Sequence, residues 1–468
     1  MNNRDVDVAV IGAGSAGMRA FRAARAWTQS VVMIEGGAYG TTCARVGCMP
    51  SKLLIAAAES AHAVRQAPEF GVNTGGVDVD GVAVMDRVRR ERDRFVGFVV
   101  DTVESLPEEQ RIRGMARFLD DHRIQVGDHT IVNAKRIVIA TGSTPTYPAF
   151  FAELGDRLVV NDDIFEWRDL PKSVAVFGPG AIGLELGQAL SRLGVDVLMF
   201  GLGGQIGPLT DPKVMESATQ ALSAEFYLDA DAKVHGMVRV DDGVSIEYDD
   251  HGGETRVATV DYVIAATGRV PNVSSLGLEN TSLPLDEKGI PEFNAETLQI
   301  GRSSVFIAGD VNNDRPVLHE AADEGTIAGD NAGRYPDVRP GLRRSPLGIV
   351  FSDPQIAMVG STFSELSQRE FVVGAVSFAD QGRSRVMLKN QGLLRVYADP
   401  DDGRFLGAEM FGPRAEHLGH LLAWAHQSNM TIGQMLEMPF YHPVIEEGLR
   451  TALRNADKQL RQPMLRAA

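Results

Sequence analysis

Two cysteines lie five residues apart near the start of the chain, in the segment GTTCARVGCMPSK (residues 40–52). In a regular helix a five-residue step rises about 7.5 Å, more than the ~4.4–6.8 Å between Cα atoms that a disulfide tolerates. A bridge between Cys43 and Cys48 therefore needs locally distorted backbone, and strain makes a disulfide easier to reduce. A thiol near a helix N-terminus, with Lys52 close in sequence, would also have a stabilised thiolate. The two residues are either a redox pair or two unrelated buried thiols.

A glycine fingerprint precedes the cysteines. Gly12, Gly14 and Gly17 follow an apolar strand-like run and open a helix-like stretch, and a second apolar run ends at Glu35. In this pattern the backbone N–H groups and the helix dipole face a pyrophosphate, and an acid about 20 residues later accepts hydrogen bonds from the ribose hydroxyls. The pattern predicts a dinucleotide-binding lobe, and beside such a lobe the redox pair is the favoured interpretation of the cysteines.

The same pattern occurs a second time, with one difference. Gly178, Gly180 and Gly183 repeat the fingerprint, but the position that corresponds to Glu35 is Gly201. No arginine stands at residues 201–205 to bind the 2′-phosphate of NADP. The second lobe therefore favours NAD and leaves NADP open.

The surrounding segments show how the lobes are built. Apolar runs at 137–142 and 263–268 both end in Thr-Gly, and a third, at 303–310, ends in Gly-Asp. Charged residues on a helical spacing between 83 and 109 predict a solvated helix. Alternating strands from Pro340 onward and a helical tail at 418–454 predict a third region.

Composition excludes several classes of protein. Lys and Arg number 46 and Asp and Glu 62, so the net charge of −16 disfavours nucleic acid and anionic lipid as partners. We find no run of 18 apolar residues and no secretory signal, which predicts a cytoplasmic protein without a membrane span. His319-Glu320 lacks a second histidine four residues after the first, so we expect no metal site.

With these motifs the chain resembles, over essentially its whole length, the class I pyridine nucleotide-disulfide oxidoreductases, the flavoenzyme family of dihydrolipoamide dehydrogenase, glutathione reductase and mercuric reductase. The family's redox segment GGTCxNxGCxPSK is matched from Cys43 to Lys52. Its second FAD signature is matched by VFIAGD (305–310), and its dimer-domain signature by FSDPQIAMVG (351–360).

The resemblance implies an acid-base pair near the C-terminus. His442-Pro443 followed by Glu447 is similar to the family's HPxxxE element. Imidazole can take and return a thiol proton near neutral pH while a carboxylate orients the ring. Taken alone, a histidine before proline is more often structural. In the family this histidine acts on the cysteines of the other subunit, so the resemblance implies an obligate homodimer with Cys43, Cys48, His442 and Glu447 as catalytic residues.

The resemblance also implies the fold and the binding residues. It predicts an α/β fold with two Rossmann-like dinucleotide-binding domains, for FAD and NAD(P), and a C-terminal α+β dimerisation domain. The expected boundaries are 1–145 and 272–340 for the FAD domain, 146–271 for the NAD(P) domain and 341–468 for the interface domain. Lys52 is expected to pair with Glu185 near the flavin. The expected cofactor-binding residues are Gly12, Gly14, Gly17, Glu35, Thr42, Lys52, Ala116, Gly142, Gly178, Gly180, Gly183, Glu185, Gly268, Asp310 and Leu318.

The implied activity is the oxidation of dihydrolipoamide to lipoamide with NAD+, with a lipoyl-bearing protein of a 2-oxoacid dehydrogenase complex as a partner. Ser51, in the PSK form, and the absence of cysteine after Cys48 favour this reading over glutathione-reductase and mercuric-reductase types. Arg45 in place of the usual Asn, Phe440-Tyr441 in place of His-Ala, and Gly201 depart from the family pattern. They leave two alternatives: an NAD(P)H-dependent reductase of another small disulfide, in which the same parts run in reverse, and a flavin transhydrogenase.

Overall fold

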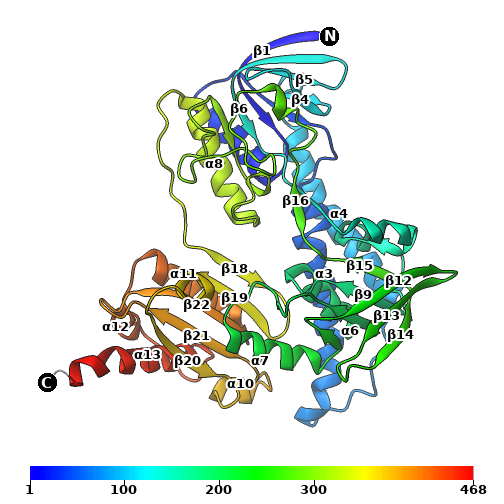
Figure 1. Cartoon of the computed structure of the whole chain (residues 1–468), viewed down its shortest axis with the longest axis vertical. Coiled ribbons are helices and arrows are strands. Elements are labelled where there is room, and N and C mark those ends of the chain that lie inside the picture. Colours follow the sequence, from blue (N-terminus) through cyan, green and yellow to red (C-terminus); the bar gives the residue numbers. More distant parts are fainter. Residues whose placement is uncertain (467–468) are drawn as a thin grey trace. The chain divides into compact units, whose positions relative to one another are not determined.

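The computed structural model describes residues 1–466, and side chains as far as Arg461. It divides into two compact units (Figure 1). Unit 1 comprises residues 1–50, 87–146 and 268–344, and unit 2 comprises 51–86, 147–267 and the chain from 345 onward. The two units do not separate an NAD(P) lobe from an interface domain, so the four-part division of the chain stays a prediction.

Unit 1 is built on a seven-stranded sheet. Its strands β3, β2, β1, β6 and β17 are parallel neighbours, and β5 and β4 continue the sheet antiparallel beyond β6. A separate pair, β7 and β16, is antiparallel. The bounds are β1 Asn2–Ile11, β2 Val31–Glu35, β3 Arg111–Arg113, β4 Ala116–Phe118, β5 Arg123–Val126, β6 Thr130–Ile139, β7 Ser143–Pro145, β16 Arg269–Pro271 and β17 Val305–Ile307.

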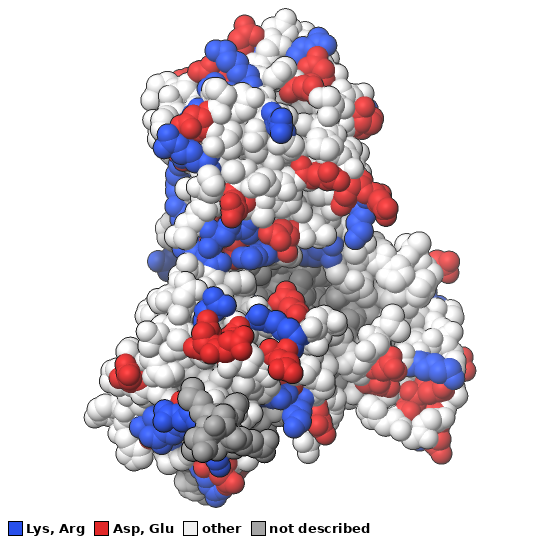
Figure 2. All heavy atoms as spheres, turned by 60° about the vertical axis from the view of Figure 1, so that its left-hand side comes forward, with Lys and Arg blue, Asp and Glu red and all other residues white. Residues whose placement is uncertain are grey.

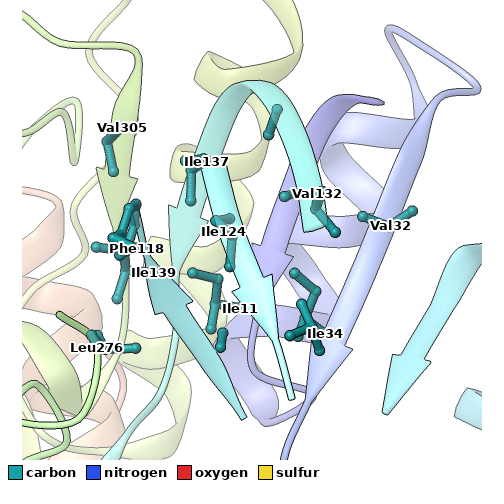
Figure 3. Close-up of a cluster of buried hydrophobic side chains, with 14 of the residues drawn as sticks. Ile11, Val32, Ile34, Phe118, Ile124, Val132, Ile137, Ile139, Leu276 and Val305 are labelled. Carbon is teal, nitrogen blue, oxygen red and sulfur yellow. The ribbon is translucent and has the colours of Figure 1, made fainter. Parts of the chain in front are cut away.

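Buried aliphatic side chains hold this sheet together. In Figure 3, Ile11, Ile34, Ile137 and Ile139 from neighbouring strands lie in one cluster with Phe118. Ile137, Ile139 and Phe118 are fully buried. Near-continuous apolar runs are what strands need when both faces of a parallel sheet are covered. The packed sheet thus fixes the turns at the carboxyl ends of β1 and β6.

Helices α1 (Ser15–Arg25) and α8 (Leu318–Arg334) pack closely on one another within unit 1. A Cβ at Gly325 would lie 2.2 Å from the carbonyl oxygen of Ala16, and one at Gly329 would lie 2.2 Å from that of Ala20. Only glycine at these two positions lets the helix backbones approach so closely. Also wholly within unit 1 are α2 Thr42–Val46 and the short turns η2 Glu108–Gln110, η4 Leu278–Asn280 and η5 Asp310–Asn312.

Unit 2 contains a five-stranded parallel sheet in the order β11-β10-β9-β15-β8 and a three-stranded antiparallel sheet β12-β13-β14. Their bounds are β8 Leu158–Val159, β9 Ser173–Phe177, β10 Asp196–Phe200, β11 Tyr227–Asp229, β12 Val234–Val240, β13 Gly243–Asp249, β14 Thr255–Val260 and β15 Tyr262–Ala265. The accompanying helices are η1 Ala67–Phe70, η3 Ala149–Arg157, α5 Asn161–Ile164, α6 Ala181–Arg192 and α7 Pro212–Ser223.

The C-terminal part of unit 2 is a five-stranded antiparallel sheet in the order β18-β19-β22-β21-β20 (Figure 1). Helix α13 packs closely on β20, and a Cβ at Gly374 of this strand would lie only 2.1 Å from the carbonyl oxygen of Ala452. The bounds are β18 Leu347–Val350, β19 Gln355–Gly360, β20 Val372–Ser377, β21 Leu393–Ala398, β22 Phe405–Gly412, α9 Phe363–Leu366, α10 Gly382–Val386, α11 Ala415–Gln427, α12 Ile432–Leu436 and α13 Glu446–Arg466.

Two long helices have residues in both units, α3 (Cys48–Gln66) and α4 (Gly81–Glu104). The solvated helix predicted at 83–109 is α4, on which Arg87, Arg90 and Arg94 are exposed. On the face shown in Figure 2, acidic and basic side chains are intermingled. Among the described residues, no helix combines the length and the apolar character needed to cross a membrane.

Candidate active site

The first glycine fingerprint forms a tight turn between β1 and α1. Gly12 has a φ of +112°, and a Cβ there would lie 2.2 Å from the carbonyl oxygen of Ala140. A Cβ at Gly17 would lie 1.9 Å from the carbonyl oxygen of Gly12. Gly14, by contrast, is the N-cap of α1 and has nothing within 4 Å of its Cβ position. The turn thus leaves an open cradle at a helix N-terminus, which suits a pyrophosphate.

Glu35 lies at the carboxyl end of β2, beside this turn. Its Oε2 accepts a hydrogen bond from the N–H of Ala13 at 2.7 Å, and its Oε1 accepts one from the N–H of Gly37 at 2.6 Å. Two backbone donors therefore hold the carboxylate in place, and its remaining lone pairs can accept from ribose hydroxyls.

Asp310 begins the turn η5, directly after Gly309, whose φ is +81°. The Ser143 hydroxyl donates to Oδ2 of Asp310 at 2.8 Å, and Arg269 Nε donates to the same hydroxyl oxygen at 2.8 Å. The preceding residue is also held, because Oε2 of the buried Glu324 accepts a hydrogen bond from the Gly309 N–H at 2.8 Å. Sequence reasoning predicts Asp310 as a cofactor-binding residue and missed these supports, which come from segments up to 167 residues away.

The cysteine segment is not one regular helix. Cys43 lies in α2, Gly47 has non-helical backbone angles (φ −128°, ψ −116°), and Cys48 begins α3. A Cβ at Gly47 would lie 3.3 Å from the Cα of Cys43, so glycine permits the close return of the chain. The backbone distortion that a bridge requires is therefore present. Cys43 is half-buried and Cys48 is exposed.

The three glycines of the second fingerprint are as tightly enclosed, or as open, as those of the first. A Cβ at Gly178 (φ +102°) would lie 2.4 Å from the carbonyl oxygen of Ala266, and one at Gly183 would lie 2.0 Å from that of Gly178. Gly180 is the N-cap of α6, and its Cβ position has nothing within 4 Å. Unit 2 therefore has a second open cradle of the same design.

The ion pair predicted between Lys52 and Glu185 is present in unit 2. Lys52 Nζ lies 2.6 Å from Oε2 of Glu185 and 4.6 Å from the ring centre of Phe351. Oε1 of Glu185 accepts from the Phe351 N–H at 2.9 Å. Both oxygens of this buried carboxylate are thus engaged, and the Lys52 side chain, 32% exposed, is held in one orientation.

The acid-base pair predicted near the C-terminus is also formed. Nδ1 of His442 lies 2.9 Å from Oε2 of Glu447, and Arg450 Nη2 donates to Oε1 of Glu447 at 2.9 Å. The hydrogen bond from His442 lowers the pKa of Glu447 below its usual value, so the group is a carboxylate at neutral pH. The His442 side chain is 80% exposed. With Nδ1 donating to the carboxylate, Nε2 is the ring nitrogen left to accept a proton.

The other predicted cofactor residues lie at turns or strand ends. Gly142 (φ +68°) and Gly268 (φ +123°) occupy the two Thr-Gly turns. Ala116 is buried in β4, Thr42 is exposed at the start of α2, and Leu318, 46% exposed, begins α8. Their contacts with a cofactor remain a prediction.

Comparison with known proteins decides the family. The model of the pyridine nucleotide-disulphide oxidoreductases matches residues 6–325, and the model of their dimerisation domain matches residues 347–453. The chain belongs to this family. It is 31% identical to the dihydrolipoyl dehydrogenase of Haloferax volcanii over 96% of both chains, and 28% identical to that of Bacillus subtilis over 95% and 94%. It is also 28% identical to the mercuric reductase of Bacillus cereus, over 98% of this chain and 72% of that one.

Solved structures confirm the fold. The HOCl-induced flavoprotein disulfide reductase RclA of Escherichia coli matches with a TM-score of 0.82 at 21% identity over 97% of this chain and 99% of that one. LpdA of Mycobacterium tuberculosis matches with a TM-score of 0.81 at 22% identity over 96% and 99%. The predicted α/β fold with dinucleotide-binding lobes and a C-terminal dimerisation domain is confirmed. The protein is a flavoprotein disulfide oxidoreductase that uses FAD and NAD(P), and its dimerisation domain indicates a homodimer.

The residues present in unit 1 fit FAD. The cradle at Gly14 has room for a pyrophosphate, and Glu35 and Asp310 are held by protein donors and keep carboxylate lone pairs that can accept further hydrogen bonds. Each would offer an acceptor to the hydroxyl groups of the bound nucleotide.

Proposed function

We propose that the protein oxidises dihydrolipoamide to lipoamide with NAD+, using Cys43 and Cys48 as the redox pair. The observation that most supports this is the pair of His442 and Glu447, in which an exposed imidazole is backed by a carboxylate at 2.9 Å. Relatives named dihydrolipoyl dehydrogenase match across nearly the whole chain. No cysteine occurs at residues 49–468 to supply a second thiol pair.

His442, Glu447 and the two cysteines carry out the thiol exchange. Nε2 of His442 takes the proton of one substrate thiol, and the thiolate attacks the Cys43 sulfur. The Cys43–Cys48 bond breaks, and Cys48 leaves as a thiolate. The second substrate thiol then attacks the substrate sulfur of the mixed disulfide, which closes the lipoyl disulfide, and its proton passes to the sulfur of Cys43, which is released as a thiol. Glu447 stabilises the imidazolium formed in the first step.

FAD, when bound, supplies the redox chemistry that carries the electron pair from the dithiol to NAD+. Gly12, Gly14, Gly17, Glu35 and Asp310 would hold it. In unit 2, the second cradle at Gly180 would hold the pyrophosphate of NAD.

Two partners follow from this proposal. The dimerisation domain supports action of His442 on the cysteines of the other subunit, as the family resemblance implies. The natural substrate would then be a lipoyl group carried on a separate protein of a 2-oxoacid dehydrogenase complex.

The decisive experiment is steady-state turnover of the purified yellow protein with dihydrolipoamide and NAD+. We expect turnover in the wild type and a loss of about 10²–10⁴-fold in His442→Ala, which removes a general base. His251→Ala changes an exposed histidine in the same unit and should keep full activity. Absence of lipoamide turnover with either nucleotide would refute the proposal.

A second function is favoured by the residues that depart from the family pattern. Tyr441, 80% exposed, directly precedes His442, and Arg45 is a cation between the two cysteines. Both could select another small disulfide, reduced at the expense of NAD(P)H. Oxidised glutathione and other disulfides tested beside lipoamide would separate the two functions. Retention of nucleotide-to-nucleotide hydride transfer in Cys43→Ser and Cys48→Ser, with no disulfide turnover in the wild type, would indicate a transhydrogenase.

A further inference from the structure

The two glycine fingerprints are separated by 166 residues, and this offset relates the two lobes position by position. Gly12 corresponds to Gly178 and Gly37 to Gly203. In unit 1 the N–H of Gly37 donates to Oε1 of Glu35 at 2.6 Å. In unit 2 the N–H of Gly203 donates at 2.7 Å to Oδ1 of Asp231. The same backbone donor therefore holds a carboxylate in both lobes, although the acid comes from a different place in the chain.

The usual place for the acid is closed in the second lobe. A Cβ at Gly201 would lie 2.4 Å from the carbonyl oxygen of Ala230 and 2.8 Å from Cγ of Pro179. Pro179 also stands where Ala13 stands in the first lobe, and proline has no N–H with which to hold a carboxylate. Compared with the first lobe, the second lobe thus lacks both the acidic side chain, at position 201, and the backbone N–H that would hold it, at position 179.

Asp231 reaches the vacated place from the neighbouring strand. Strand β11 ends at Asp229 and pairs in parallel with β10, so the residues that follow both strands lie at the same edge of the sheet. The N–H of Gly201 donates to the Asp229 carbonyl at 2.7 Å, and the N–H of Ala232 donates to the Gly201 carbonyl at 3.1 Å. Asp231 lies within this closed loop. It is exposed, and among the described residues its Oδ2 has no hydrogen-bond partner.

We propose that Asp231 is the ribose-binding acid of the second lobe and makes the protein selective for NAD(H) over NADP(H). Its carboxylate accepts hydrogen bonds from the hydroxyls of the adenosine ribose and repels a 2′-phosphate. The proposal rests on assigning the second lobe to the pyridine nucleotide, and it is independent of which disulfide the enzyme uses.

The charges around Asp231 agree with this selectivity. Residues 201–207 contain no Lys or Arg. The nearest cation along the chain beyond Asp231 is Lys233. Its Nζ lies 2.8 Å from Oδ2 of Asp249, with which it forms an ion pair. The N–H of Gly204 donates to the carbonyl of Ala230 at 3.0 Å, so this amide is also occupied. A 2′-phosphate would meet the carboxylate of Asp231, and residues 201–207 would offer it no side chain of opposite charge.

The test is reduction of the enzyme-bound FAD by NADH and by NADPH, followed in a stopped-flow instrument without any disulfide substrate. We expect the wild type to be reduced at least about 100-fold more efficiently by NADH, the scale of a hydrogen-bonded charge. Asp231→Asn keeps an acceptor for the Gly203 N–H and removes the charge, and should reduce the NADH preference about 10-fold or more. Asp231→Glu keeps a carboxylate at this position and should keep most of the NADH preference.

Asp241→Asn is the matched control, because it removes one exposed charge from the same unit at a turn between β12 and β13. It should leave the preference unchanged. Equal reduction by both nucleotides in the wild type, or the same change in Asp231→Asn and Asp241→Asn, would overturn the proposal. Because the assay contains no dithiol, a failure of the lipoamide proposal would leave this result intact. The bound-FAD spectrum of each variant verifies that it is folded.

Discussion

Lys52 and Glu185 form a tight ion pair across 133 residues of sequence, with 2.6 Å between Nζ and Oε2. The same carboxylate accepts a hydrogen bond from the N–H of Phe351, and the ring centre of Phe351 lies 4.6 Å from Lys52 Nζ. Helix α3, helix α6 and the turn after β18 are thereby joined at one carboxylate. Glu185 is thus a structural support as well as the partner of the lysine next to the cysteine segment.

Removal of this carboxylate should destabilise the protein. Glu185→Ala leaves a half-buried ammonium and the Phe351 N–H without their acceptor, and we expect a loss of about 1–3 kcal/mol in the free energy of unfolding. Urea denaturation of the FAD-bound protein measures it. Glu279→Ala is the control, because its pair with Arg117 is exposed on both sides (58% and 64%) and should contribute less than about 1 kcal/mol. Equal losses in both variants would contradict the structural role.

Gly14 tests the FAD cradle of unit 1. Its φ of −76° is open to any residue and its Cβ position has nothing within 4 Å, so Gly14→Ala should fold normally. The added methyl group would occupy the place of the pyrophosphate, and we expect FAD affinity to fall about 10–100-fold. Equilibrium titration of the apoprotein with FAD measures it. Gly97→Ala, in α4 with equally open space, should bind FAD as the wild type does.

Glu324 should make stability depend on pH. Burial raises the pKa of Glu324 to about 6, above the ordinary value of 4.5 that applies to the unfolded chain. The folded protein therefore holds this proton more tightly, and the unfolding free energy should decrease by about 2 kcal/mol as pH rises from about 4.5 through 6. Glu324→Gln cannot ionise, so its stability relative to the wild type should improve by that amount between pH 4 and pH 7.5.

Urea denaturation at a series of pH values measures this difference. Glu287→Gln, which removes an exposed carboxyl group from the same unit, is the control. If the Glu324→Gln difference were constant or reversed in sign, the ion pair of Glu324 with Arg343, 2.9 Å from Oε1, would outweigh the burial of the carboxyl group.

Gly201 should not accept the acid that its position usually holds. Even Gly201→Ala places a Cβ 2.4 Å from the carbonyl oxygen of Ala230, and we expect a loss of about 1–3 kcal/mol in stability. Thermal denaturation compares it with Gly236→Ala in β12, where nothing lies within 4 Å and the change should stay within about 0.5 kcal/mol. A Gly201→Ala variant as stable as Gly236→Ala would show that the loop can open to admit a side chain at position 201.

The elements closest to the chemistry could be predicted because their signals are local. The glycines at 12, 14 and 17 satisfy contacts made within one turn and with one neighbouring strand, so their spacing alone predicts the cradle. The pair of His442 and Glu447 is likewise only five residues long. The exposed helix at α4 follows from charge periodicity.

Other residues could be assigned only from the folded chain. Comparison of position 201 with position 35 showed that an acid was missing, and nothing in that comparison pointed to Asp231, 30 residues further on. Which carboxylate reaches the Gly203 N–H depends on β11 pairing with β10, a choice made by the sheet as a whole. The support of Asp310 by Ser143, and of Gly309 by Glu324, depends in the same way on the packing of distant segments.

The sequence by itself determined the two nucleotide lobes, the cysteine segment and the acid-base pair, because their geometry is imposed by residues adjacent in the chain. The tertiary structure alone decided which acid serves the second lobe and which residues support Asp310. Those contacts join residues tens to hundreds of positions apart, and only the register of parallel strands and the close packing of helices bring such residues within hydrogen-bond distance.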